Sequence, residues 1–234
     1  EVGDVIDAEG YLYWYNGPNP HITGVFAPEA DEGQMTYLDY MAADIDVEVT
    51  MKLYVQDTQS WWNDTITVYA ATRNGGVFIY GMACSEDDAK KLVPGTEIIV
   101  DGYKSEGAGE VEIVDAKFEF GSDTTYIADA VDLTGLFAED KADKIEGFMN
   151  RKFTVKDAEI AASQDADGKD VAYLYNWDGS GSQGDDLYFN IKVGDVQYSF
   201  TVESYLRGAD TDVYKAVEGL SIGDKVDLTG FLYW

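Results

Sequence analysis

Short runs of alternating apolar and polar residues, separated by glycine-rich turns, dominate this chain and predict strands joined by tight turns. In the central region the Asn74-Gly75 pair predicts a hairpin turn between two such runs. An acidic segment near 85–92 opens with Ser85, a residue favoured as a helix N-cap, and predicts a short helix. The strands expected in this region lie near 47–56, 64–72, 76–81, 97–104 and 110–119.

The last third of the chain repeats this order of elements. The expected first strand lies near 151–162, the second is formed by 171–177 together with 187–193, and the third lies near 196–203. A helix near 210–219 and a fourth strand near 224–233 follow. Three strands, a helix and two further strands is the order of the OB barrel, whose helix joins the third and fourth strands. We therefore predict an all-β fold with short helices, built from tandem OB-like five-stranded Greek-key barrels, each with a helix between strands 3 and 4.

An internal repeat supports this organisation. Residues 2–14 match residues 222–234 without a gap, 220 positions apart, and a weaker third copy occupies 93–103. Every copy keeps two glycines at the same spacing. The first glycine opens a turn, and the second permits a bend or bulge in the strand that follows.

The repeat also predicts the domain boundaries. Residues 1–27 correspond to the fourth and fifth strands of an OB-like unit, with the fifth near 21–26. Residues 28–120 form an OB-like domain with an N-terminal linker and helix, and residues 121–234 form an OB-like domain that lacks its own fifth strand.

Residues 1–27 have three alternatives: they close the C-terminal barrel of the same molecule, pair with a neighbouring molecule, or remain an isolated hairpin. Because an unpaired strand edge is prone to association, we expect pairing, which includes a strand-paired homo-oligomer. Since 11–14 duplicate 231–234, both segments cannot occupy one fourth-strand position. Either the fifth strand alone is borrowed, or the segment pairs elsewhere.

Several motifs resemble a known group of proteins. The run 82–96, with 102–106 and 109–116, resembles tandem OB-fold repeats found in uncharacterised secreted proteins and lipoproteins of Gram-positive gut bacteria. The end at 230–234, with 15–23, resembles their partner repeat. This resemblance implies the OB fold and an extracellular or cell-surface location, and it implies no particular activity.

The charge balance narrows the choice of partner. The chain has 16 Lys and Arg against 45 Asp and Glu, a formal net charge of −29. An acidic surface repels nucleic acids and anionic membranes, so we expect neither as a partner. No apolar run is long enough to span a bilayer, which predicts no direct insertion into a membrane.

Residues suited to catalysis are scarce. Phosphate-binding, metalloprotease and nucleophile-elbow motifs are absent from the sequence, and a Ser-His-Asp triad would have to use His21, the single histidine. Cys84, the single cysteine, is expected to be a small buried residue. We therefore predict a protein that is not an enzyme, with a hydrolase of unknown type as the third alternative.

Aromatic residues are the best candidates for a ligand site. Trp61 and Trp62 are adjacent in a polar loop, where neighbouring side chains rarely both point into a core. Tyr175 and Trp177 are expected on one face of a strand. These four predict an extracellular binding module for a neutral carbohydrate or peptide, because exposed rings on OB barrels stack on sugars as on bases. The alternative is a structural spacer repeat whose aromatics fill the barrel cores and the seams between barrels.

A weaker pattern suggests calcium. Asp165, Asp167 and Asp170 surround Gly168 at a spacing that suits a loop folded around a hard cation. The pattern departs from the EF-hand, and a second acidic, Gly/Ser-rich loop occupies 178–186. The alternative for both loops is a solvated turn.

Overall fold

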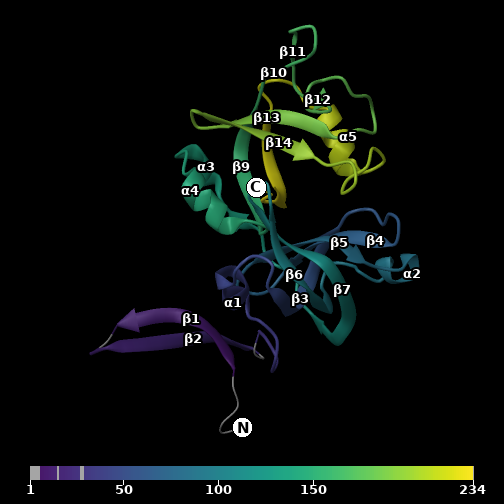
Figure 1. The fold of residues 1–234 in the computed structure, drawn as a ribbon. Coiled ribbons are helices and arrows are strands. Elements are labelled where there is room, and N and C mark those ends of the chain that lie inside the picture. Colours follow the sequence, from purple (N-terminus) through teal and green to yellow (C-terminus); the bar gives the residue numbers. More distant parts are fainter. Residues whose placement is uncertain (1–5, 15, 27–28, 234) are drawn as a thin grey trace.

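The computed structural model describes residues 6–14, 16–26 and 29–233, which form mainly strands. Figure 1 shows three parts along the molecule: a projecting N-terminal hairpin, a barrel, and a second sheet that ends near the C-terminus. The all-β prediction is therefore confirmed, together with one closed five-stranded barrel.

The closed barrel contains five strands in the order β3-β4-β5-β7-β6. Only β5 and β7 pair in parallel; the other neighbours are antiparallel. Helix α1 (Tyr37–Ala42) precedes the barrel, and the short α2 (Glu86–Ala89) lies between β5 and β6. Five of the predicted strands are thereby confirmed: β3 (Glu48–Thr58), β4 (Thr65–Ala71), β5 (Gly76–Ala83), β6 (Thr96–Gly107) and β7 (Glu110–Thr125).

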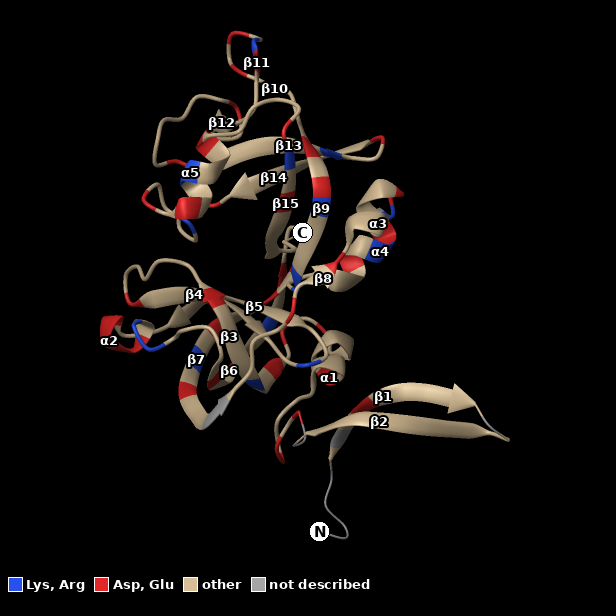
Figure 2. Ribbon diagram, turned by 180° about the vertical axis from the view of Figure 1, so that it is seen from behind, with Lys and Arg blue, Asp and Glu red and all other residues tan. Residues whose placement is uncertain are grey.

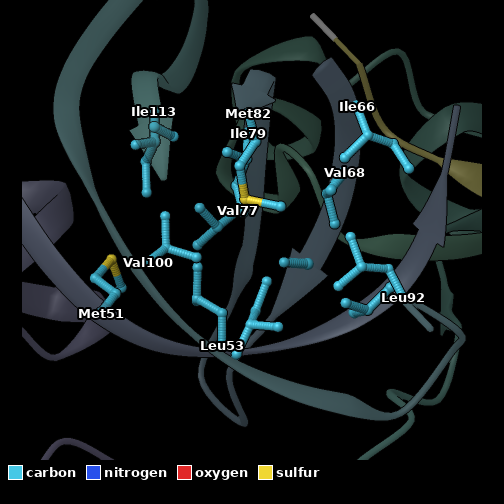
Figure 3. Close-up of a cluster of buried hydrophobic side chains, with 14 of the residues drawn as sticks. Met51, Leu53, Ile66, Val68, Val77, Ile79, Met82, Leu92, Val100 and Ile113 are labelled. Atoms are coloured by element: carbon cyan, nitrogen blue, oxygen red, sulfur yellow. The ribbon is translucent and has the colours of Figure 1, made fainter. Parts of the chain in front are cut away.

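The interior of this barrel is sealed. Alternate residues of β3, including Met51 and Leu53, have no exposed surface, as expected where one strand face is buried. Figure 3 shows these side chains converging with Ile79, Val100 and Ile113 from the other strands. Tyr40 of α1 is buried in the same core, so the helix packs on the barrel.

The second sheet is built on β9 (Lys152–Ala161), which pairs with β13 on one side and β15 on the other. Its order is β12-β13-β9-β15, and β14 pairs with β13. Helix α5 (Asp212–Glu218) lies between β14 and β15 in the chain and buries Tyr214 and Val217 in the sheet's core. The other main strands are β12 (Leu174–Tyr175), β13 (Leu187–Val193), β14 (Val196–Val202) and β15 (Lys225–Phe231).

Short elements complete this part of the chain. They are β8 (Val131–Asp132), α3 (Thr134–Ala138), α4 (Ala142–Ile145), the 3-10 turn η1 (Glu146–Phe148), β10 (Ser163–Gln164) and β11 (Asp170–Val171). The continuous strand predicted over 171–177 is wrong. It is broken into β11 and β12, and Asn176 follows with a φ of 61°, a left-handed conformation that ends the strand.

The N-terminal hairpin consists of β1 (Asp7–Trp14) and β2 (Pro18–Phe26), which pair antiparallel. It extends away from the barrel, on the side opposite the second sheet (Figures 1 and 2). Most of its side chains are exposed. Tyr15, which alternates with Tyr11 and Tyr13 in the sequence, lies outside the described residues.

Candidate functional site

A cleft of about 1710 Å³ lies between the closed barrel and the second sheet. Exposed aromatic side chains surround it from both sides, and polar groups lie between them. The aromatic residues are Trp62, Tyr80, Tyr205 and Tyr233, and the polar ones include Asp57, Gln59, Ser60, Glu203 and Arg207. Clefts of this kind between two folded units are common ligand sites.

Polar contacts hold the two walls of the cleft together. Asp57 of β3 forms an ion pair with Arg207, which follows β14. The side-chain amide of Gln59 donates to the Glu203 carboxylate at 2.8 Å, and the Ser60 N–H donates to the Tyr205 carbonyl oxygen at 2.8 Å. The cleft is therefore a defined feature that both units build.

An aromatic seam lies beside these contacts. The Tyr69 ring stacks on Phe231 of β15 with ring centroids 4.4 Å apart, and Phe78 meets Tyr233 edge-on at 5.5 Å. Tyr69 and Phe78 are buried, although they lie outside the barrel core. Burial raises the pKa of the Tyr69 hydroxyl, so that side chain stays neutral.

The structure separates the two adjacent tryptophans. Trp62 and Thr65 bond to each other through both backbone groups, with Asn63 and Asp64 at positive φ in a tight turn. The Trp61 ring packs against the barrel core, and its indole N–H donates to the Cys84 carbonyl oxygen at 2.8 Å. Trp62 points the other way, is 76% exposed and lines the cleft.

Tyr175 and Trp177 lie elsewhere and do not line the cleft. The Tyr175 hydroxyl donates to the Glu218 carboxylate of α5 at 2.6 Å, and this bond, ahead of burial, raises the pKa of Tyr175. Trp177 follows the left-handed Asn176 and is 71% exposed. The four aromatic residues predicted from the sequence therefore belong to three environments.

The acidic loop suggested for calcium does not gather its carboxylates. The Asp165 carboxylate accepts the backbone N–H groups of Asp167 and Lys169 at 3.0 and 2.9 Å, an arrangement typical of a polar turn. Within the described ranges, no group of three or more acidic, His or Cys side chains is placed to hold a metal ion. Asp165, Asp167 and Asp170 thus gain no structural support as ligands.

The carboxylates of Asp186 and Glu203 in the cleft accept hydrogen bonds from other protein groups. Asp186 accepts the Ser204 N–H and hydroxyl at 2.8 and 2.7 Å. Burial raises the pKa of Glu203, the bond from Gln59 opposes that rise, and the nearby Asp186 adds to it. Figure 2 shows acidic residues in all parts of the fold, as expected from the net charge of −29.

Two residues considered for catalysis lie away from the cleft. Cys84 is buried, and burial raises the pKa of its thiol to about 11, which keeps the thiol protonated and unreactive. His21 is on the projecting hairpin, with its ring 4.9 Å from that of Tyr13.

Sequence reasoning did not identify Tyr80, Tyr205, Tyr233 or Arg207. These residues come from three separated segments of the chain, and only folding brings them to one cleft. A possible sequence indication was the aromatic-basic cluster Tyr205-Leu206-Arg207 in an otherwise acidic stretch.

No protein-family model matches the chain, and no curated protein matches it. Three solved structures show a partial likeness, each at 9% sequence identity. They are described as "Structural mimicry for functional antagonism" (TM-score 0.36, covering 77% of this chain and 79% of that one), "Molecular basis for abrogation of activation of pro-inflammatory cytokines" (0.34, 67% and 77%) and "Structure of murine DNA binding protein bound with ds DNA" (0.33, 66% and 73%).

Proposed function

We propose that the protein is an extracellular, non-enzymatic binding module that holds a neutral carbohydrate in the cleft between two OB-like units. The observation that supports this most directly is the group of exposed aromatic rings around one concave site: Trp62, Tyr80, Tyr205 and Tyr233. An aromatic ring offers an apolar face for the C–H groups of a sugar, and tyrosine adds a hydroxyl for its polar edge.

Assignment of the OB-like architecture rests on the order of elements. Each unit has three meandering strands, a helix and a fourth strand, and the closed barrel adds a fifth strand between its third and fourth. Trp62 lies in the loop between the first two strands of the closed barrel. That loop is one of those with which OB folds bind oligosaccharides and oligonucleotides.

Charge favours the neutral ligand. At a net charge of −29 the protein repels polyanions, whereas a neutral sugar has no such penalty. The described chain has no helix long and apolar enough to cross a bilayer. The extracellular location is supported by the resemblance of the repeat to those of secreted proteins.

The test is a glycan array followed by calorimetric titration of the best ligand, with Trp62→Ala as the variant. The matched control is Trp177→Ala, because Trp177 is similarly exposed and does not line the cleft. Loss of a central aromatic contact costs about 2 kcal/mol or more, so affinity should fall about 30-fold in Trp62→Ala alone. Equal affinity of both variants, or a response only to a peptide library, would contradict the proposal.

A structural spacer is the second candidate, and the aromatic seam favours it. Stacking of Tyr69 on Phe231 joins the two units with no need for a ligand. If the seam is the function, Tyr69→Ala should uncouple the unfolding of the two units while the array stays silent for the parent protein. The hydrolase alternative lacks comparable support, because Asp57, Asp186 and Glu203 are each bound to other protein groups.

A further inference from the structure

One glycine lacks the close neighbour that the equivalent glycines have. The repeat places Gly10 in β1, Gly102 in β6 and Gly230 in β15 at the same position. A Cβ added to Gly102 would lie 2.6 Å from the Ile113 side chain and 2.8 Å from the Val114 oxygen, both on β7. A Cβ on Gly10 would lie 2.3 Å from the His21 oxygen on β2.

Within the part of the chain that the structure describes, Gly230 has no such close neighbour. Its nearest neighbour would be a ring carbon of Phe153 at 3.8 Å, an ordinary contact. The adjacent strand that makes glycine necessary in β1 and β6 is thus not beside β15 in the described structure. The conserved spacing of the motif indicates that a strand belongs there.

The edge strands of the second sheet also indicate a missing strand. In the closed barrel β7 lies between β5 and β6, and it seals the interior. The equivalent strands of the second sheet, β14 and β15, each pair with one neighbour only among the described strands. The inward residues Phe200 and Leu228 are half-buried, and the cleft extends past them into the open side of the sheet.

The N-terminal hairpin has an apolar face that no other described element covers. Leu12 of β1 lies on the same face as Ile22 and Val25 of β2, since Gly10 pairs with Ile22 and Ala8 with Val25. All three are more than half exposed. The repeat equivalent of Leu12 is Leu232, which is buried in the second sheet. In the described structure these three side chains therefore belong to neither hydrophobic core.

We infer that β2 of one copy of the chain inserts between β15 and β14 of a second copy and closes its barrel. The donor is a second copy because the hairpin projects from the end of the molecule opposite the second sheet (Figure 1). β15 replaces β1 beside β2, since the two strands share one sequence motif. The exchange preserves one antiparallel ladder and adds a parallel ladder with β14, as β7 has with β5.

This exchange has a defined register. Transfer of the β1–β2 pairing to β15 sets Ile22 opposite Gly230 and Val25 opposite Leu228. Both apolar side chains then face the interior, beside Leu228. The inserted strand would fill the part of the cleft that Phe200 and Leu228 line, whereas the carbohydrate proposal rests on the exposed aromatic rings of the same cleft. Association and sugar binding are measured by separate experiments, so failure of one is distinguishable from failure of the other.

Sedimentation equilibrium of the whole chain tests the association. The parent protein should associate with increasing concentration, and Gly230→Ala should weaken this about ten-fold or more, because the added methyl meets the inserted backbone. The variant should fold as well as the parent, since among the described residues of the monomer its methyl meets only Phe153. The control is Gly147→Ala, where an added Cβ meets no atom of the described residues within 4 Å. A parent that stays monomeric, or a Gly230→Ala variant that associates equally well, would overturn the inference.

Disulfide trapping tests the register. Chains with Val25→Cys, mixed with chains with Leu228→Cys, should form a cross-linked dimer under mild oxidation, because directly opposite residues lie within reach of a disulfide. Val226→Cys, one pleat away on the same face, should not link. Cross-linking through Val226→Cys alone, or no cross-link in either mixture, would overturn the proposed insertion.

Discussion

The closed barrel and the second sheet share an order of elements and differ in whether the sheet returns on itself. Ile98 of β6 and Val226 of β15 occupy the same position of the repeat, yet Ile98 has no exposed surface while Val226 is half-buried. β15 alternates strictly from Lys225 to Thr229, and β6 has three consecutive apolar residues at 98–100, yet Ile98 and Val226 both contact the hydrophobic core of their own unit. The difference shows that a fifth strand, more than the composition of the other four, determines how completely such a core excludes water.

The largest contrast should come from truncating these matched positions. We expect Ile98→Ala to lower the free energy of unfolding by about 3 kcal/mol, because it leaves a cavity in a sealed core, and Val226→Ala to cost about 1 kcal/mol or less. Urea unfolding in dilute solution, followed by tryptophan fluorescence, measures both. Equal losses would mean that the second sheet is as well sealed as the barrel.

The sequence predicted local features of both regions and missed the contacts between residues that are far apart in the chain. Alternation and turn residues located the longer strands, because both are local properties, whereas the two-residue strands β8 and β10 were not predicted. The sequence match also identified β1 as similar to β15. The break at Asn176 was missed because a left-handed residue can interrupt an otherwise regular pattern. The cleft could not be assembled from sequence, since Trp62 and Tyr205 meet only through the packing of two units. Trp61 was misjudged because its indole bond to Cys84 is non-local.

The two equivalent helices offer a smaller contrast. Thr211 caps α5 by accepting the Tyr214 N–H, and Ser85 caps α2 by accepting the Asp88 N–H. Replacing either by alanine removes one cap, worth about 1 kcal/mol. We expect Thr211→Ala to approach that loss and Ser85→Ala to cost less, because α5 buries two side chains and α2 buries none. Thermal unfolding measures the difference; a larger loss in Ser85→Ala would reverse the expected importance of the helices.

The ion pair between Asp57 and Arg207 joins the two regions directly. A double-mutant cycle with Asp57→Asn and Arg207→Gln should give a coupling energy below about 1 kcal/mol, since Arg207 is partly exposed to solvent. The coupling should decrease with added salt. The pair Lys90 and Glu86, exposed on one helix, is the control and should couple more weakly. A coupling unaffected by salt would indicate that packing, more than charge, joins the units.

The smallest effect concerns Glu203, the acid that Gln59 of the other region holds. Burial raises the folded-state pKa of Glu203 above its usual value, so the folded protein binds this proton more readily than the unfolded chain. Stability from this group is therefore present at low pH and is lost as pH rises through the raised pKa. Glu203→Gln keeps an acceptor for Gln59 and removes the buried charge, so it should raise the melting temperature at neutral pH and lose that advantage in acid. The exposed Glu139→Gln separates this effect from the change in net charge; an equal gain in that variant would attribute the stabilisation to reduced repulsion over the whole acidic surface.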